Sequence, residues 1–426
     1  MTPAKGFAEM KDSGIEWIGE IPAHWNLTRL QSQLYEINEI NNPVKTTQVL
    51  SLTNKLGVIP YEEKGNQGNK AKEDFTGYKI AYPSCIVANS MNILIGSVGL
   101  SQYYGCVSPV YYVFRAKDSA NIKFLNYLFS LPSFQKELRK YANGILEIRL
   151  RVSSGNILRR KIALPPLNEQ ATIVSYLDAQ CAKIDEIIAQ AKASIEDYKQ
   201  WKASIIYEAV TKGLDPNVEM KESGIPCVDE IPKSWTVTRF GKIATVKSNL
   251  VNPKDYQSYK QISPENIEKG SGVLLDCGTV EESGVISGNH LFYKGQILYS
   301  KIRPTLNKVI IAPFDGLCSA DMYPIDTDHC SRFILYLMLS AYFNEQVALV
   351  TGNRVKMPKI NQNELSQIMV AIPSGTEEQQ IAKYLDSSCS QIDVLIKEKQ
   401  SLLDDLESYK KSLIYEIVTG KRSVQQ

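Results

Sequence analysis

Histidine and cysteine, the residue types that most often build metal or nucleophilic sites, are scattered along this chain of 426 residues. The three histidines, His24, His290 and His329, share no motif, and a serine replaces His24 where its surrounding peptide recurs. The eight cysteines form no CxxC pair, which argues against a zinc site and against a disulfide framework. We therefore expect His24 to be satisfied or solvated and the thiols to be reduced, with no metal site in this chain.

Motifs for binding a nucleotide or a methyl donor do not stand out either. TGKRS at 419–423 lacks the leading glycine of a GxxxxGK[ST] loop, and NNPVK at 41–45 is not the Asn-Pro-Pro-aromatic motif of amino-methyltransferases. Some carboxylates recur at equivalent positions: Asp178 with Asp386, and Asp185 with Asp393. We expect these to be solvated charges on helices. The chain does not look like an enzyme by itself.

The elements that would position such residues come in two copies. MKDSGIEWIGEIPAHWNLTRL (10–30) is matched by MKESGIPCVDEIPKSWTVTRF (220–240), with 11 of 21 positions identical. The period of about 210 residues is far longer than a solenoid repeat and has the size of a domain. The chain therefore looks like a tandem duplication. Trp25 and Trp235 lie in the shared peptide and are expected to anchor the core of each copy.

A second repeat predicts two long helices. Residues 173–211 pair without a gap with residues 381–419, and 16 of 39 positions are identical. Apolar residues recur at alternating steps of four and three, the pattern of a coiled coil. The first copy has Leu177, Cys181, Ile184, Ile188, Ala191, Ile195, Tyr198, Ile205 and Ala209, with Lys202 as the polar exception. The second copy has Leu385, Cys389, Ile392, Ile396, Leu403, Leu406, Leu413 and Ile417, with Lys399 and Lys410 as exceptions. The simplest prediction is that the two helices pair with each other. Separate amphipathic helices on two globular cores are the alternative.

The remainder of each half predicts a mixed domain. Residues 30–120 and 240–330 contain short apolar runs, such as KIAYPSCIVA and GQILYS, that predict strands separated by turns. FLNYLFSLPSFQKEL (124–138) and FILYLMLSAYFNEQV (333–347) predict helices with a buried face. The two halves scarcely match in the strand-rich parts, although the order of their elements does.

The expected fold class is α+β, with pseudo-two-fold symmetry. Two globular mixed α/β domains, at 1–165 and 214–372, alternate with long helices at 166–213 and 373–426. A helix of about 40 residues spans roughly 60 Å, which a domain with a radius of gyration near 15 Å cannot easily bridge. The end of the first helix should therefore lie near the start of the second. This predicts an antiparallel coiled coil with a globular domain at each end.

Composition sets broad limits on function. An apolar fraction of 43% is ordinary for a globular protein. The net charge of +2 argues against a tail that binds polyanions, but it leaves room for local basic patches. The N-terminus lacks the apolar core of a signal peptide, and no apolar run reaches the length of a membrane span. We expect a soluble, cytoplasmic protein with no membrane partner.

The borders of the repeated segments carry a family resemblance. IPxxW opens each half, PPLNEQATIVSYLD and PSGTEEQQIAKYLD begin the long helices, and SIIYEAVTKG and SLIYEIVTGK close them. In this order, over essentially its whole length, the chain resembles the specificity subunit of a type I restriction-modification system. One departure is PSGTEEQ in place of the more usual PPLxEQ form, which leaves open where the second long helix begins.

The resemblance implies a non-catalytic subunit that binds double-stranded DNA. Each target recognition domain would read one half of a bipartite target, and the coiled coil would set the gap. The implied partners are two methyltransferase subunits, which use S-adenosylmethionine to methylate adenine N6, and restriction subunits, which use ATP and Mg. The chain itself would bind no cofactor. The exposed faces of the two long helices are expected to serve these partners.

Base contacts in such a subunit would come from polar and basic side chains on loops of the variable parts. The candidates in the first half are Asn89, Ser90, Asn92, Tyr103, Tyr104, Arg149 and Arg151. The candidates in the second half are Ser300, Lys301, Arg303, Asn307, Lys308, Asn353, Arg354, Lys356 and Lys359. They cluster at corresponding places in both halves, which favours contact with DNA. Solvated basic surface is the ordinary alternative for any one of them.

Two other functions remain open from the sequence. The chain could serve a related system in which nuclease and methyltransferase form one separate chain. It could also be a coiled-coil adaptor with two protein-binding or sugar-binding domains and no role with DNA.

Overall fold

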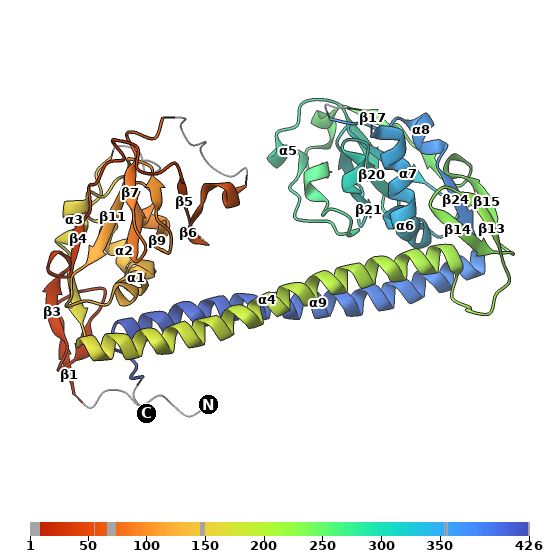
Figure 1. Ribbon diagram of the computed structural model, residues 1–426. Helices are drawn as coiled ribbons and strands as arrows, with labels where there is room; N and C mark the ends of the chain where they lie inside the picture. The colour runs from red at the N-terminus through yellow and green to blue at the C-terminus, as the bar shows by residue number, and fades with distance from the viewer. Residues whose placement is uncertain are drawn as a thin grey trace. The chain divides into compact units, whose positions relative to one another are not determined.

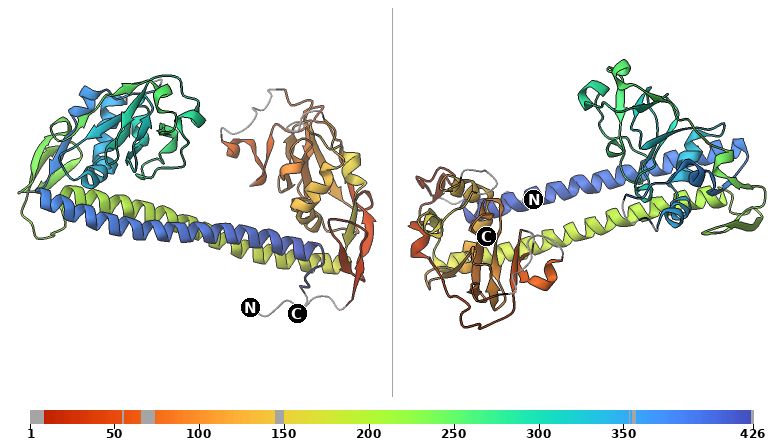
Figure 2. Two further views of the ribbon diagram at one scale, coloured as in Figure 1. Left: turned by 180° about the vertical axis from the view of Figure 1, so that it is seen from behind. Right: turned by 90° about the horizontal axis from the view of Figure 1, so that it is seen from above.

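The computed structural model describes residues 9–54, 56–65, 74–144, 150–352, 354 and 357–424. Its contacts divide the chain into two compact units: unit 1 comprises residues 1–190 and 402–426, and unit 2 comprises residues 191–401. Each unit therefore contains one globular domain and a part of both long helices (Figures 1 and 2).

Unit 1 is built around a four-stranded antiparallel sheet with the strand order β4-β11-β8-β9. The strands of this unit are β1 (Met10–Asp12), β2 (Glu20–Pro22), β3 (Asn26–Arg29), β4 (Leu34–Glu36), β5 (Leu50–Thr53), β6 (Gly57–Pro60), β7 (Lys79–Ala81), β8 (Cys85–Asn89), β9 (Val98–Ser101), β10 (Gly105–Val107), β11 (Tyr111–Ala116) and β12 (Lys161–Leu164). The helices are α1 (Ile122–Ser130), α2 (Pro132–Arg139), α3 (Ser154–Leu158) and the first part of α4 (Leu167–Lys212), with short 3₁₀ turns η1 (Leu30–Ser32), η2 (Tyr61–Lys64) and η3 (Ile93–Ile95). Phe114 of the sheet packs with Phe129 of α1 at the centre of the core.

Unit 2 repeats this sheet in the order β16-β23-β20-β21 and adds a second sheet, β17-β19-β22-β18. Its strands are β13 (Met220–Ile225), β14 (Val228–Pro232), β15 (Thr236–Arg239), β16 (Thr245–Val246), β17 (Leu250–Val251), β18 (Lys260–Ile262), β19 (Asn289–Phe292), β20 (Ile297–Ser300), β21 (Val309–Ile311), β22 (Gly316–Cys318), β23 (Met322–Asp326) and β24 (Met369–Ile372). Its helices are α5 (Val280–Ser283), α6 (Ser331–Leu339), α7 (Ala341–Thr351), α8 (Gln362–Ser366) and most of α9 (Gly375–Val418), with 3₁₀ turns η5 (Phe240–Lys242), η6 (Pro253–Tyr256), η7 (Pro264–Asn266) and η8 (Pro304–Leu306). The α+β prediction, with the same framework in both halves, is confirmed.

The helix predicted at 124–138 is two helices in the structure. Leu131 is extended, with φ −68° and ψ 124°, and Pro132 occupies the first turn of α2. Proline has no N–H to continue the hydrogen bonding of α1, so a new helix starts there. The equivalent helices α6 and α7 meet at 60°. In the described part of the chain, no single helix is both long and apolar enough to cross a membrane, and α6 with α7 meets that test only as a bent pair.

The repeated tryptophan joins three elements in each unit. Trp25 is fully buried and donates from Nε1 to Glu169 Oε1 at the start of α4, at 3.0 Å. Trp235 is 1% exposed and donates in the same way to Glu377 at the start of α9. The end of the other long helix packs on each indole, through Gly420 in unit 1 and Gly213 in unit 2. The core-anchor prediction is confirmed. The shared peptide is retained because it ties a β-hairpin to both long helices.

The long helices run antiparallel within each unit. In unit 1, the start of α4 and the end of α9 meet at Trp25, and further along, Lys410 Nζ lies 2.6 Å from Asp185. In unit 2, the end of α4 and the start of α9 meet at Trp235, and further along, Lys202 Nζ lies 2.7 Å from Asp393. Residue numbers therefore rise on one helix as they fall on its neighbour. The coiled-coil prediction is confirmed inside each unit.

The four repeated carboxylates lie on the long helices with side chains 41–58% exposed, as expected, but each also has a protein partner that the sequence analysis did not identify. Asp185 and Asp393 hold Lys410 and Lys202, two of the three polar exceptions in the heptads. The other two carboxylates accept a hydrogen bond from a tyrosine of the globular domain, Asp178 from Tyr127 and Asp386 from Tyr336, each at 2.7 Å. Burial, together with this bond, raises the pKa of both tyrosines. These contacts fasten each helix to its own domain.

Replacing Gly420 with alanine is expected to lower the free energy of unfolding by about 2–4 kcal/mol. Gly420 has φ +73°, and an added Cβ would lie 2.4 Å from Pro22 Cδ and 3.2 Å from Trp25. The cost combines a left-handed backbone at about 1 kcal/mol with overpacking at about 1–3 kcal/mol. Urea unfolding followed by circular dichroism measures it. Gly375→Ala is the matched control, since its Cβ would meet nothing within 4 Å. An equal loss in both variants would contradict this account.

Candidate nucleic-acid interface

Each main sheet carries a strand–turn–strand unit, and the two units together hold half of the predicted base-contacting residues. In unit 1 it is β8, η3 and β9, closed by a hydrogen bond from Asn89 N to Ser97 O at 3.0 Å. In unit 2 it is β20, η8 and β21, closed by Ser300 N to Lys308 O at 2.9 Å. The two turns are equivalent, so the sequence had placed these candidates at structurally corresponding sites.

The second predicted segment lies beside this turn in both units. In unit 1, Val152 N donates to Ser90 O at 3.2 Å. In unit 2, Ile360 N donates to Lys301 O at 3.0 Å, and Arg303 N donates to Pro358 O at 2.8 Å. Segments more than 50 residues apart in the sequence thus form one surface. We call the two surfaces the first and second turn surfaces, made by residues 89–92 with 150–152, and by residues 300–308 with 354 and 357–360.

Four of the predicted residues lie inside the fold, which argues against base contact by their side chains. They are Asn89, Ser90, Ser300 and Asn307, whose exposure ranges from 1% to 7%. Asn89 Oδ1 accepts from Met91 N, Ser300 Oγ donates to Ile302 O, and Asn307 Nδ2 donates to Met338 O. These side chains hold the turns in shape, because a short polar side chain after a strand readily bonds to nearby backbone.

The backbone of the second turn takes unusual conformations. Arg303 and Asn307 have φ of +43° and +47°, on either side of η8. In the first turn, Gly96 stands at the place of Asn307, with φ +88°. Left-handed backbone is rare for arginine and common for glycine and asparagine. At Arg303 this conformation sets the direction of the backbone, and the side chain of Arg303 is exposed.

Two of the exposed basic candidates of the second turn surface, Arg354 and Lys359, have acidic neighbours. Lys359 Nζ lies 3.0 Å from Asp321 Oδ1, and Arg354 forms an ion pair with Glu364. The bond from Arg354 lowers the pKa of the Glu364 carboxyl, which keeps the pair charged. The sequence analysis did not identify Asp321 and Glu364, because nothing in a linear pattern marks a carboxylate that meets its partner through the fold. Asp321 and its partner Lys359 are 38 positions apart in the sequence.

Two lysines of this surface bind the protein itself. Lys308 Nζ donates to Pro264 O at 2.6 Å, and Lys301 Nζ lies 5.3 Å from the centre of the Tyr323 ring. Both side chains are partly buried. They shape the surface, and each ammonium group already has a partner within the protein.

The first turn surface has a different character. Asn92 and Arg151 are exposed, and Arg151 Nη2 lies 3.6 Å from the sulfur of Met91. Tyr104 is 39% exposed and packs on Tyr82, with ring centres 5.4 Å apart, whereas Tyr103 is partly buried. Arg149, Asn353 and Lys356 lie outside the described residues. For the exposed candidates, DNA contact stays a prediction.

The histidines near the helix starts are satisfied, as expected for His24. His24 Nε2 lies 2.8 Å from Glu169 Oε2, and His329 Nδ1 lies 2.6 Å from Glu378 Oε1. His290 is 4% exposed, and burial lowers its pKa. Among the described residues, no three histidine, cysteine or acidic side chains are grouped so that they could hold a metal ion.

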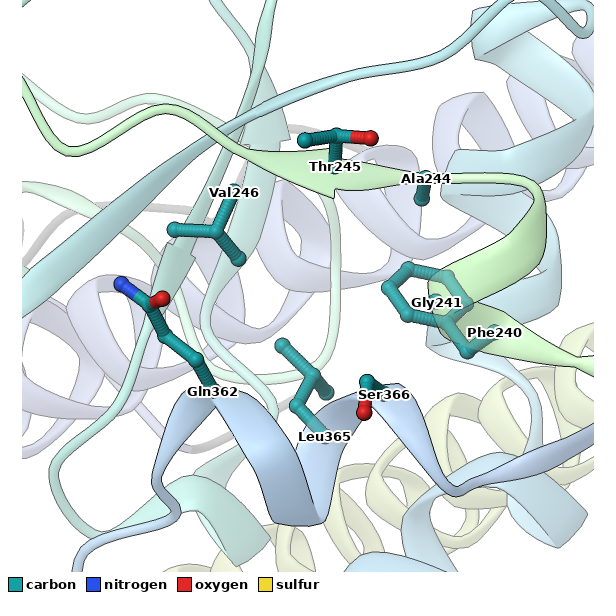
Figure 3. A pocket seen from close by; sticks show the side chains of 8 residues that line it. All are labelled: Phe240, Gly241, Ala244, Thr245, Val246, Gln362, Leu365 and Ser366. Atoms are coloured by element: carbon teal, nitrogen blue, oxygen red, sulfur yellow. The ribbon is translucent and has the colours of Figure 1, made fainter.

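A cavity of about 210 Å³ lies between η5, β16 and α8 of unit 2 (Figure 3). Its lining consists of Phe240, Gly241, Ala244, Thr245, Val246, Gln362, Leu365 and Ser366. No charged side chain lines it, and it is smaller than ordinary ligand sites of about 300 Å³ or more.

The long helices expose apolar side chains at equivalent positions. Trp201 of α4 is 53% exposed and Tyr409 of α9 is 40% exposed; Ile187 and Leu395 are a second equivalent pair, at 45% and 37%. The register of the Lys202–Asp393 pair places Trp201 at the level of Leu395, and that of Lys410–Asp185 places Tyr409 at the level of Ile187. Each unit thus carries an aromatic and an aliphatic residue together. We call these pairs the helix patches.

Comparison with known proteins gives one consistent family. A model described as type I restriction modification DNA specificity domain matches twice, at residues 30–197 and 232–403. The type I restriction enzyme EcoDI specificity subunit of Escherichia coli is 30% identical over 289 residues, which cover 64% of this chain and 65% of that protein. The match therefore spans slightly less than two thirds of this relative. A putative type I restriction enzyme MjaX specificity subunit of Methanocaldococcus jannaschii is 24% identical over 445 aligned residues, with 96% of each chain covered.

Solved structures agree on the fold. A chain from work on "complex assembly and conformational transition of the type I R-M system" superposes with a TM-score of 0.71 at 14% identity, covering 93% of this chain and 98% of the other. The HsdS subunit from Thermoanaerobacter tengcongensis superposes with a TM-score of 0.51 at 14% identity, covering 94% and 98%.

Proposed function

The chain belongs to the family of type I restriction modification DNA specificity domains, and we propose that it is the subunit that gives such a complex its DNA sequence specificity. The observation that carries this is the pair of turn surfaces. They have one backbone framework in two copies, and different side chains stand at equivalent places, Asn92 against Arg303 and Arg151 against Lys359. A pair of readers for two different half-targets needs this combination.

Each unit would read one half of a bipartite target in double-stranded DNA. The exposed side chains of the turn surfaces include arginine, lysine and asparagine, which bond to guanine or adenine edges and to phosphates. α4 and α9 each contribute to both units as continuous helices of 46 and 44 residues, so they would fix the unread gap. Two sites on one face of a duplex need a spacing of whole turns, about 34 Å each.

Two methyltransferase subunits would bind at the helix patches. The patches occur once in each unit, at equivalent positions, as the binding of two identical partners requires. Exposed tryptophan and tyrosine are typical of the residues that dominate protein interfaces. The partners would supply the chemistry: adenine-N6 methylation with S-adenosylmethionine, and ATP- and Mg-dependent restriction by further subunits. The chain itself would be non-catalytic and would act in the cytoplasm.

Methylation mapping tests this function directly. The chain is co-expressed with the methyltransferase encoded beside it in a host without DNA methylation, and N6-methyladenine is located by sequencing. The expected result is a split motif, two short defined blocks with a fixed undefined gap. A continuous motif would exclude two separate readers. If no methylation occurs and the purified complex binds no duplex, the adaptor alternative stands. A single fused nuclease-methyltransferase partner would instead identify the related system.

A further inference from the structure

The two globular domains differ sharply in charge. Residues 1–165 contain 20 lysines and arginines against 13 acidic residues, whereas residues 214–372 contain 16 against 17. The difference continues at the turn surfaces. Lys359 and Arg354 of the second surface hold acidic partners, but the neighbour found for Arg151 of the first surface is a methionine sulfur. The near-neutral total charge thus conceals one basic and one neutral domain.

One position in the main sheet shows this inversion most clearly. Arg115, in β11, pairs with Tyr35 of β4, and Asp326, in β23, pairs with Thr245 of β16. The preceding residues, Phe114 and Ile325, are both buried, so the two sheets match here in register and in orientation. A basic residue in the first domain therefore stands where the second has an acidic one.

Arg115 is exposed beside Tyr35, Tyr82 and Tyr104, which we call the tyrosine cluster. Its guanidinium lies 5.4 Å from the centre of the Tyr82 ring, and Tyr82 packs in turn on Tyr104. Tyr35, opposite in the sheet, is 43% exposed. The cluster contains one carboxylate, Glu39, which is held by Lys45 and accepts from the Tyr82 hydroxyl at 2.6 Å. Because Lys45 balances Glu39, the charge that remains for a ligand is that of Arg115.

Asp326, at the equivalent place, is already held by protein partners. Its Oδ1 accepts from Gln296 Nε2 at 2.6 Å, and Lys247 lies 3.9 Å from its other oxygen. The second domain therefore offers a largely neutralised acidic group at this place, and no positive charge to bind a phosphate.

We propose that Arg115, with its tyrosine cluster, contacts a DNA phosphate outside the turn surfaces, and that the first domain makes more phosphate contacts than the second. This rests on the proposed DNA-reading function and extends it. Arginine and tyrosine are ordinary phosphate donors, and each phosphate neutralised by a protein steepens the salt dependence of binding by about 0.9 in log K against log salt. The first half-target is thus held more by charge, and the second more by contacts that salt does not weaken.

The test uses the full chain in complex with its methyltransferase and a labelled random-sequence DNA duplex, titrated over a range of KCl concentrations. Arg115→Gln is expected to flatten the salt slope by about 0.9, and Arg115→Lys is expected to restore it. Asp326→Asn is the matched control and should cause no loss of affinity. Asp326→Arg should steepen the slope by about 0.9, because it builds the missing contact at the equivalent place. The methylation motif should be the same in all four, since a phosphate contact carries no base identity.

Three results would contradict the expectation, and each has a different meaning. If the wild-type complex binds the duplex and Arg115→Gln leaves the slope unchanged, the inference is wrong while the proposed function stands. Weaker assembly with the methyltransferase at an unchanged slope would assign the cluster to a protein partner, and would also overturn it. If the wild-type complex binds no duplex, the proposed function fails first. Thermal unfolding of each variant, followed by circular dichroism, shows that the fold is intact.

Discussion

Replacing Trp25 with alanine is expected to lower the free energy of unfolding by about 3–5 kcal/mol. Trp25 is fully buried, so the substitution leaves a large cavity among residues of the hairpin, the start of α4 and the end of α9. It also removes one hydrogen-bond partner of Glu169, a carboxylate that is only 6% exposed. A buried charge that loses a donor adds to the cost.

Urea unfolding followed by circular dichroism measures this loss. Trp235→Ala should cost a similar amount, because Trp235 makes the equivalent bond to Glu377. If the units unfold in separate steps, each substitution should move one step, which identifies the unit. Trp201→Ala is the control of the same chemistry: this tryptophan is 53% exposed, and its loss should change stability by no more than about 0.5 kcal/mol. Equal effects at Trp25 and Trp201 would refute the anchoring role.

Trp201→Ala and Tyr409→Ala are each expected to remove one of two bound methyltransferases. Truncation of an aromatic residue at the centre of an interface typically costs about 2 kcal/mol or more, which is roughly thirtyfold in affinity. The wild-type chain should co-purify with two methyltransferase subunits, each single variant with one, and the double variant with none. Mass photometry at nanomolar concentration gives these ratios directly.

Two controls make this second result specific. Lys192→Ala, an exposed position of the same helix, should leave two methyltransferases bound. The free double variant should unfold at the same urea concentration as the wild type, because neither side chain is buried. A double variant that still binds two methyltransferases would show that the partners use another surface.

The shared framework could be predicted from the sequence because each of its signals is repeated. Trp25 and Trp235 stood in the same peptide, so their common role was visible without coordinates. The long helices followed from a heptad pattern, which depends only on local periodicity. Lys202 and Lys410 looked like flaws in that pattern, because their partners Asp393 and Asp185 lie on the other helix. Cross-helix pairing of this kind depends on register, which a single sequence does not state.

The turn surfaces were predicted less well, for a physical reason. A serine or asparagine can bond to a base or to its own backbone, and the residue type is the same in both cases. Ser300 and Asn307 therefore looked like readers and are buried. Arg115 was missed because it lies in a strand that reads as apolar. Its exposure depends on which face of the sheet it takes and on the tyrosine opposite.

The division of the long helices between units has a consequence for biosynthesis. Unit 2 is a single continuous stretch, residues 191–401, and all of it has been made when α9 is only partly translated. Unit 1 needs residues from 402 onward, which are synthesised after all of unit 2. We therefore expect unit 2 to be completed before unit 1, which reverses the usual order in which the N-terminal domain folds first during synthesis. Until residues 402–420 have been synthesised, the face of the first domain that receives Gly420 and the end of α9 stays uncovered.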